Sequence, residues 1–130
     1  MPLAGRQLTW DSALARCYEA GWRGKPLVQA VALMCAESGR YTQAYHVNFP
    51  GSTQESTDRG LFQINDKAHP DLPIEDAFKV HANVGFAHRL YMDSDKTFRA
   101  WAAFNSGAYE RFLPDVQKYY DRGKWRKKVA

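Results

Sequence analysis

Cysteine is scarce in this sequence: only Cys17 and Cys35 occur in 130 residues. Both lie on apolar helix faces, which favours buried thiols over a disulfide bridge. The histidines, cysteines and carboxylates show no metal-ligand spacing, so we expect neither a metal nor a cofactor. No apolar run approaches the ~20 residues that cross a bilayer, and residues 1–10 lack the apolar core of a signal peptide. These absences exclude a disulfide scaffold and a membrane-spanning protein.

Positive charge is concentrated at one end of the chain. The net charge is +4, and the last nine residues, RGKWRKKVA, carry five positive charges, so residues 1–121 sum to −1. We therefore expect a single domain over residues 1–121 and a basic C-terminal tail over 122–130. The nearly neutral body and the lack of a recognised motif argue against nucleic acid as a partner. Two interpretations of the tail stay open: a solvated terminus, or a surface that attracts an anionic polymer.

The periodicity of apolar residues predicts a mostly helical fold with at most a small β-hairpin. A length of 130 residues, with 45% hydrophobic and 25% charged residues, is typical of one globular domain. Residues 40–57 lack periodicity and are expected to form a loop, with a short hairpin inside it as an open alternative. A short buried strand containing Leu61, Phe62 and Ile64 is expected to follow. The expected helices cover residues 10–20 after the cap Thr9, 26–38, 74–92 with Gly85 on the inner face, 97–105, and a last helix within 109–121.

Glu37 stands out by its position. The segment Ala30–Ser38, AVALMCAES, is apolar around nearly its whole circumference, which is typical of a helix buried in a core. Glu37 lies near its C-terminal end, where the helix dipole is negative and solvent is scarce, and both effects raise the pKa of a carboxyl group. A carboxylic acid that stays protonated near neutral pH can serve as a general acid. On this segment alone, a helix-end glutamate that faces water remains an alternative.

Three segments in order, ES at 37–38, STDRGLFQIN at 56–65 and AWAAFNSG at 100–107, carry a resemblance to a known family. Over roughly residues 29–109 the chain resembles the lysozyme-like superfamily, which includes c-type lysozymes and lytic transglycosylases. The resemblance implies that Glu37 is the catalytic acid, Asp58 the second carboxylate and Gly60 a close-packed glycine. Phe104 stands where lytic transglycosylases usually carry a tyrosine. The residues that the resemblance assigns to substrate binding are Gln63, Asn65, Ala100, Trp101 and Asn105.

The chemistry of glycoside cleavage agrees with two carboxyl groups in unlike surroundings. One must protonate the leaving oxygen, and the other must stabilise or capture the oxocarbenium-like centre, as is known for lysozyme. We expect Glu37 to be dry beneath Trp101, and Asp58 to be ionised with Arg59 beside it. Three alternatives stay open: Trp101 as plain core, Asp58 as a turn residue that bonds its own backbone, and Glu55 as the second carboxylate.

The resemblance implies a mainly α, α+β lysozyme-like domain that cleaves the β-1,4 bond between N-acetylmuramic acid and N-acetylglucosamine in peptidoglycan. Asp58 and Phe104 favour hydrolysis by water, as in a lysozyme or muramidase. A lytic transglycosylase that forms 1,6-anhydro products is the first alternative, and an inactive saccharide-binding relative is the second.

The expected partners are peptidoglycan glycan strands and, through the basic tail, anionic wall polymers; we expect a monomer. Action at the bacterial cell wall without a signal peptide suggests a phage lysin, a virion-associated module or a fragment of a longer protein. The four histidines, His46, His69, His81 and His88, are interpreted as structural or solvent-facing.

Overall fold

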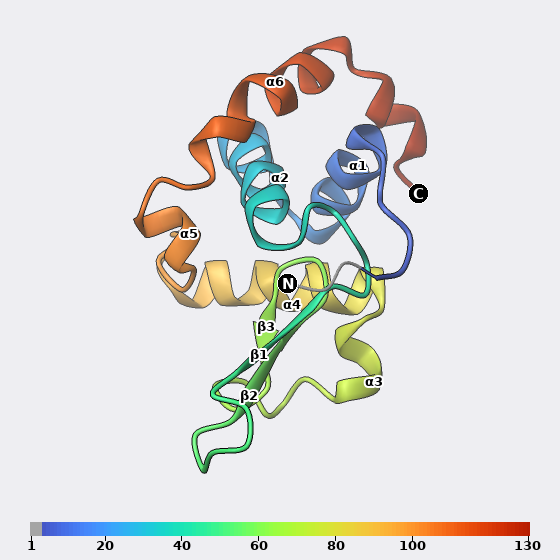
Figure 1. Ribbon diagram of the computed structural model, residues 1–130. Coiled ribbons are helices and arrows are strands. Elements are labelled where there is room, and N and C mark those ends of the chain that lie inside the picture. The colour runs from blue at the N-terminus through green and yellow to red at the C-terminus, as the bar shows by residue number, and fades with distance from the viewer. Residues whose placement is uncertain (1–3) are drawn as a thin grey trace.

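The computed structural model describes residues 4–130, which form a helical body with a small antiparallel sheet projecting from one end (Figure 1). The predicted mainly α fold is confirmed. None of the helices in this described range is both long and apolar enough to cross a membrane. The elements are α1 (Trp10–Ala20), α2 (Gly24–Ser38), β1 (Tyr45–Asn48), β2 (Ser56–Arg59), β3 (Ile64–Asn65), α3 (Ile74–Ala77), α4 (Val80–Asp93), α5 (Ala102–Asn105), the 3-10 helix η1 (Glu110–Phe112), α6 (Leu113–Arg122) and the 3-10 helix η2 (Lys124–Lys128).

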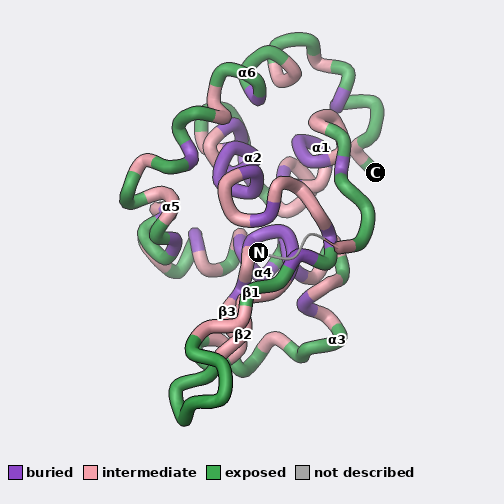
Figure 2. The backbone as a smooth tube through the Cα atoms, in the orientation of Figure 1, coloured by how far each residue is buried: buried purple, intermediate pink, exposed green. Residues whose placement is uncertain are grey.

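Helix α2 is the centre of the core, as its sequence indicated. It contacts α1, α5 and α6, and it is mostly buried along its length (Figure 2). Gly39 ends the helix at φ 62°, a left-handed conformation that glycine adopts at little cost. Cys17 and Cys35 are both buried free thiols, and burial raises the pKa of Cys35 to about 12. The burial of α2 and the turn at Gly39 fix the position of the end of this helix, and with it the position of Glu37.

The β region contains the small hairpin that the sequence allowed, and it differs from the prediction at the expected strand over Leu61, Phe62 and Ile64. It is a three-stranded antiparallel sheet in the order β1-β2-β3, and the hairpin formed by β1 and β2 begins in the predicted loop and ends just beyond it, at Arg59. Leu61 and Phe62 are buried in the turn between β2 and β3, where Gly60 and Gln63 both have positive φ. Their apolar character reflects the packing of this turn onto the core. The strands β1 and β2 have no fully buried residue, so they lack the alternating pattern that marks a strand.

The predicted helix over residues 74–92 is divided into α3 and α4. Phe78 and Lys79 interrupt it, and Lys79 is extended, with φ −84° and ψ 134°. The interruption rotates the buried face of α4, so Gly85 is exposed, contrary to the prediction, while Asn83 and Val84 are buried.

The predicted helix over residues 97–105 is reduced to the four residues of α5. Asp95 and Lys96 both have φ 57°, and Trp101 is extended at the start of α5, so the chain approaches this helix irregularly. Phe98 and Trp101 are still buried, because a turn in which the Trp101 N–H donates to the Phe98 carbonyl directs both rings inward. The spacing of Phe98 and Trp101 therefore predicted correctly that both are buried, but the helix that it predicted at these residues was wrong.

The basic C-terminal segment packs against α1. Trp125 is 1% exposed, its indole N–H donates to the Tyr120 carbonyl at 3.1 Å, and its ring lies 5.2 Å from that of Tyr18. The Ala130 N–H donates to the Glu19 carboxylate. In Figure 1 this segment lies beside α1, far from the tip of the β-hairpin.

Candidate active site

A cleft with a volume of about 290 Å³ lies between the end of α2, the sheet and the start of α5. From the sequence, seven residues were assigned to catalysis or substrate binding. Six of them line this cleft, and the seventh, Asn105, does not. A larger hollow of about 590 Å³ lies between α2 and α6, and among the described residues 4–130 no carboxylate lines it, so it offers no pair of carboxyl groups. The lining residues of the cleft are Glu37, Asp58, Gln63, Ile64, Asn65, Ala68, His69, Leu90, Ala100, Trp101 and Ala102.

Glu37 enters the cleft from the last turn of α2. Its pKa is raised from 4.5 to about 7, first by burial and second by the negative charge of Asp58. The direction agrees with the expectation from the sequence, although Asp58 replaces the helix dipole as the second cause. A carboxyl group with this pKa is substantially protonated at neutral pH and can donate a proton.

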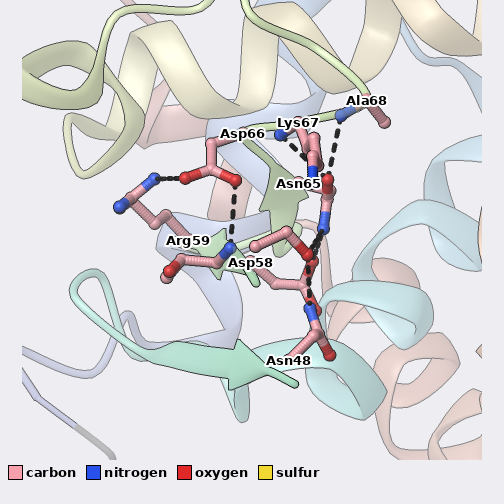
Figure 3. A network of polar contacts seen from close by, with 9 residues as sticks. Asn48, Asp58, Arg59, Asn65, Asp66, Lys67 and Ala68 are labelled. Carbon is pink, nitrogen blue, oxygen red and sulfur yellow. Dashed lines mark hydrogen bonds and ion pairs between the residues drawn. The ribbon is translucent and has the colours of Figure 1, made fainter. Parts of the chain in front are cut away.

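Asp58 enters the same cleft from β2 and is held by two side-chain amides (Figure 3). Asn48 donates to Oδ2 at 3.1 Å, and Asn65 donates to Oδ1 at 2.8 Å. The same two amides also donate to the Ser56 hydroxyl, at 3.3 and 2.9 Å. An ionised carboxylate only accepts hydrogen bonds, so two N–H donors match that form and fix its orientation.

Arg59 is not the partner of Asp58, contrary to the expectation. Its guanidinium forms an ion pair with Asp66 at 2.9 Å, because successive residues of a strand point to opposite faces of the sheet. The pKa of Asp66 is lowered, chiefly by a hydrogen bond from the Thr57 backbone and further by Arg59. Glu55, the alternative second carboxylate, is exposed, accepts from the Gly51 N–H and lies outside the cleft lining.

Gln63 and Asn65 line the cleft, but their amide groups bind the protein itself. The Gln63 Nε2 group donates to the carbonyls of Ala44 and Gly60, both at 2.9 Å. Asn65 uses both N–H bonds as described above, and its oxygen accepts from the backbone N–H groups of Lys67 and Ala68 (Figure 3). These side chains therefore shape the loops that border the cleft.

Asn83 holds the turn between β2 and β3 in place, and sequence reasoning missed it. This side chain on α4 is 1% exposed, accepts from the Phe62 N–H at 2.9 Å, and donates to the carbonyls of Arg59 and Ala77. Gly60 is close-packed as expected, since a Cβ there would lie 2.3 Å from both the Ala77 oxygen and the Asn83 amide nitrogen. The signal available in the sequence was one amide side chain, Asn83, among apolar residues on the buried side of a helix, because a buried amide needs hydrogen-bond partners.

Trp101 serves the core and the cleft together. It is 5% exposed, its indole N–H donates to the Phe62 carbonyl at 2.9 Å, and it also borders the cleft next to Ala100. Asn105 is exposed and donates to the Arg99 carbonyl, away from the cleft lining. The ring of Phe104 stacks on that of Tyr109, with 4.6 Å between centroids, and does not line the cleft either.

One histidine lies in the cleft. His69 borders it, whereas His46 and His81 are exposed elsewhere, and His88 packs edge-on against Trp22 with its pKa lowered by burial and by Arg23. Within residues 4–130, no group of three or more histidine, cysteine or acidic side chains is arranged to hold a metal ion.

A protein-family model described as a lysozyme-like domain matches residues 14–103. The match includes every residue that lines the cleft, from Glu37 to Ala102, while α6 and η2 lie beyond it. Neither the curated proteins nor the solved structures contain a match to this chain.

Proposed function

We propose, from the premise that this chain belongs to the lysozyme-like domain family, that it cleaves the β-1,4 bond between N-acetylmuramic acid and N-acetylglucosamine. The family acts on peptidoglycan, as glycosidases or lytic transglycosylases. The observation that carries the proposal is the pair formed by Glu37, with a pKa of about 7, and the amide-bound carboxylate of Asp58 in one cleft.

In the proposed reaction, the Glu37 carboxylic acid donates its proton to the glycosidic oxygen. The bond between that oxygen and the anomeric carbon breaks, and its electron pair stays on the oxygen. The carboxylate of Asp58 stabilises or captures the positive centre that remains. A water molecule then adds to this carbon and passes one of its protons to Glu37. Where Asp58 has captured the carbon, the bond between them breaks and its electron pair returns to Asp58, so both carboxyl groups are restored.

Hydrolysis is the favoured version of the reaction because Asp58 lies in the cleft with its orientation fixed by Asn48 and Asn65. Phe104, which lacks the tyrosine hydroxyl, stacks on Tyr109 and supports the same choice. The alternative is a lytic transglycosylase, in which the 6-hydroxyl of the muramic residue attacks the same carbon and gives up its proton to Glu37. Both versions need the same acid and differ in their products.

The test is digestion of purified peptidoglycan by the wild type, Glu37→Gln and a control, Glu55→Gln, with mass spectrometry of the products. We expect Glu37→Gln to lose at least about 100-fold in rate, because general acid catalysis contributes about that much or more. Glu55 is exposed outside the cleft, so its variant should cut normally. Normal cutting by folded Glu37→Gln would refute the role of Glu37. Reducing ends indicate hydrolysis, anhydro ends a transglycosylase, and no product an inactive relative.

We further propose that η2 attracts anionic wall polymers. Lys124, Arg126, Lys127 and Lys128 are exposed, and within residues 4–130 none of them forms an ion pair. The buried ring of Trp125 holds the segment that carries them against the body. Because residues 1–121 sum to −1, most of the attraction to a polyanion would come from this surface.

A further inference from the structure

The polar side chains of the cleft are mostly engaged with the protein. Both N–H bonds of the Gln63 amide and both of the Asn65 amide are donated internally, and the Asn65 oxygen accepts two backbone N–H groups. Asp58 accepts the amides of Asn48 and Asn65. A saccharide in the cleft therefore finds few free donors on the side chains that the sequence singled out.

His69 is the exception. Its ring borders the cleft, and within the described residues 4–130 neither of its nitrogens has a hydrogen-bond partner. The backbone of His69 is held on both sides: its N–H donates to the Asn65 carbonyl at 3.0 Å, and its carbonyl accepts from Leu72 at 3.3 Å. The ring lies edge-on against Phe86, with 5.5 Å between centroids. Packing therefore positions the imidazole and leaves its polar atoms unused.

We infer that His69 is a saccharide-binding residue whose imidazole hydrogen-bonds a hydroxyl or acetamido group of the glycan. This inference rests on the proposed function and deepens it. A neutral imidazole carries one donor and one acceptor, which complements groups that both donate and accept. The adjacent Ala68, Leu90 and Ala100 are small or apolar and leave the polar contact to His69. Glu37 supplies the proton, so His69 contributes to binding alone.

The variants separate hydrogen bonding from packing. His69→Phe keeps an aromatic ring against Phe86 and loses the polar atoms, whereas His69→Gln keeps a donor and an acceptor. His81→Phe is the matched control, because His81 is exposed on α4 and does not line the cleft. Each substitution is made in Glu37→Gln protein, so that a soluble N-acetylglucosamine tetramer can be titrated by calorimetry without being cut.

We expect His69→Phe to raise the Kd about fivefold, which is about 1 kcal/mol at 1.4 kcal/mol per tenfold change. That size is typical of one net hydrogen bond. His69→Gln should recover part of the loss, and His81→Phe should bind normally. In otherwise wild-type enzyme, His69→Phe should raise KM and leave kcat unchanged, since the contact is made equally in the ground and transition states.

Equal Kd values for the His69→Phe and His81→Phe proteins, or no binding of the tetramer at all, would overturn the inference. A second measurement does not depend on how the variants fold: in ¹⁵N-labelled wild-type protein, the imidazole resonances of His69 should move during the titration, and those of His81 should not. If His69 binds as expected but the wild type cuts no peptidoglycan, the proposed activity fails and the saccharide contact stands.

Discussion

Glu37→Gln should stabilise the protein at pH 8 and leave its stability nearly unchanged at pH 4. The folded state raises the pKa of Glu37 from 4.5 to about 7, through burial and then the charge of Asp58. Between these two values the folded protein holds a proton that the unfolded chain has already released. Stability falls with rising pH wherever the folded state binds more protons, so this loss begins near pH 4.5 and is complete above pH 7.

The magnitude follows from the two pKa values. Each pH unit between them is worth about 1.4 kcal/mol, so ionised Glu37 costs on the order of 3 kcal/mol of unfolding free energy by pH 8. Glutamine resembles the protonated acid in shape and cannot ionise, so it avoids this cost. At pH 4, which lies below the ordinary pKa of 4.5, the glutamate is mostly protonated in both states, and the difference should nearly vanish.

Urea denaturation of the wild type and Glu37→Gln at pH 4, 6 and 8 measures the effect, with Glu55→Gln on the exposed hairpin as the control. The stability gain of Glu37→Gln should grow with pH, while that of the control should not. A gain that is the same at pH 4 and pH 8 would refute the reasoning. If Glu37 is also the acid, kcat/KM of the wild type should decline above about pH 7.

Three further perturbations test other parts of the structure. Asp58→Asn should reduce peptidoglycan hydrolysis by far more than tenfold, and residual activity within about tenfold, or ~1.4 kcal/mol of barrier, would favour the transglycosylase. Asn83→Ala leaves the Phe62 N–H and the carbonyls of Arg59 and Ala77 without the Asn83 side chain as a partner, so urea denaturation should report a loss of about 3 kcal/mol or more in unfolding free energy. A loss below about 1 kcal/mol would contradict the conclusion that Asn83 holds this turn in place. Replacing Lys124, Arg126 and Lys127 together by Gln should weaken binding to intact walls and flatten its salt dependence, since such attraction is screened over ~8 Å at physiological salt, with turnover of soluble oligosaccharides unchanged. If the variant and the wild type bind walls with the same salt dependence, these charges do not contribute to wall binding.

Local sequence signals were sufficient for the helical core and for the position of Glu37. The apolar circumference of α2 and the glycine that ends it predicted a buried helix with a carboxyl group near its last turn, because helix periodicity and capping depend on neighbouring residues. The Thr9 cap of α1 was readable for the same reason: its hydroxyl accepts from the Ser12 N–H three residues on. The close packing of Gly60 came from the family resemblance.

The tertiary structure alone decided how the cleft is assembled. The amides on Asp58 come from Asn48 and Asn65, and the sheet register, which pairs Asp58 with Asn65, places them there while Arg59 turns to the other face. The position of His69 likewise depends on the turn after β3 and on Phe86 of a distant helix. A single-residue change in register would exchange the faces of the strand, and β1 and β2, which have no fully buried residue, carry no local pattern that encodes that choice. Local sequence therefore determined that Glu37 ends a buried helix, and long-range packing determined what surrounds its carboxyl group.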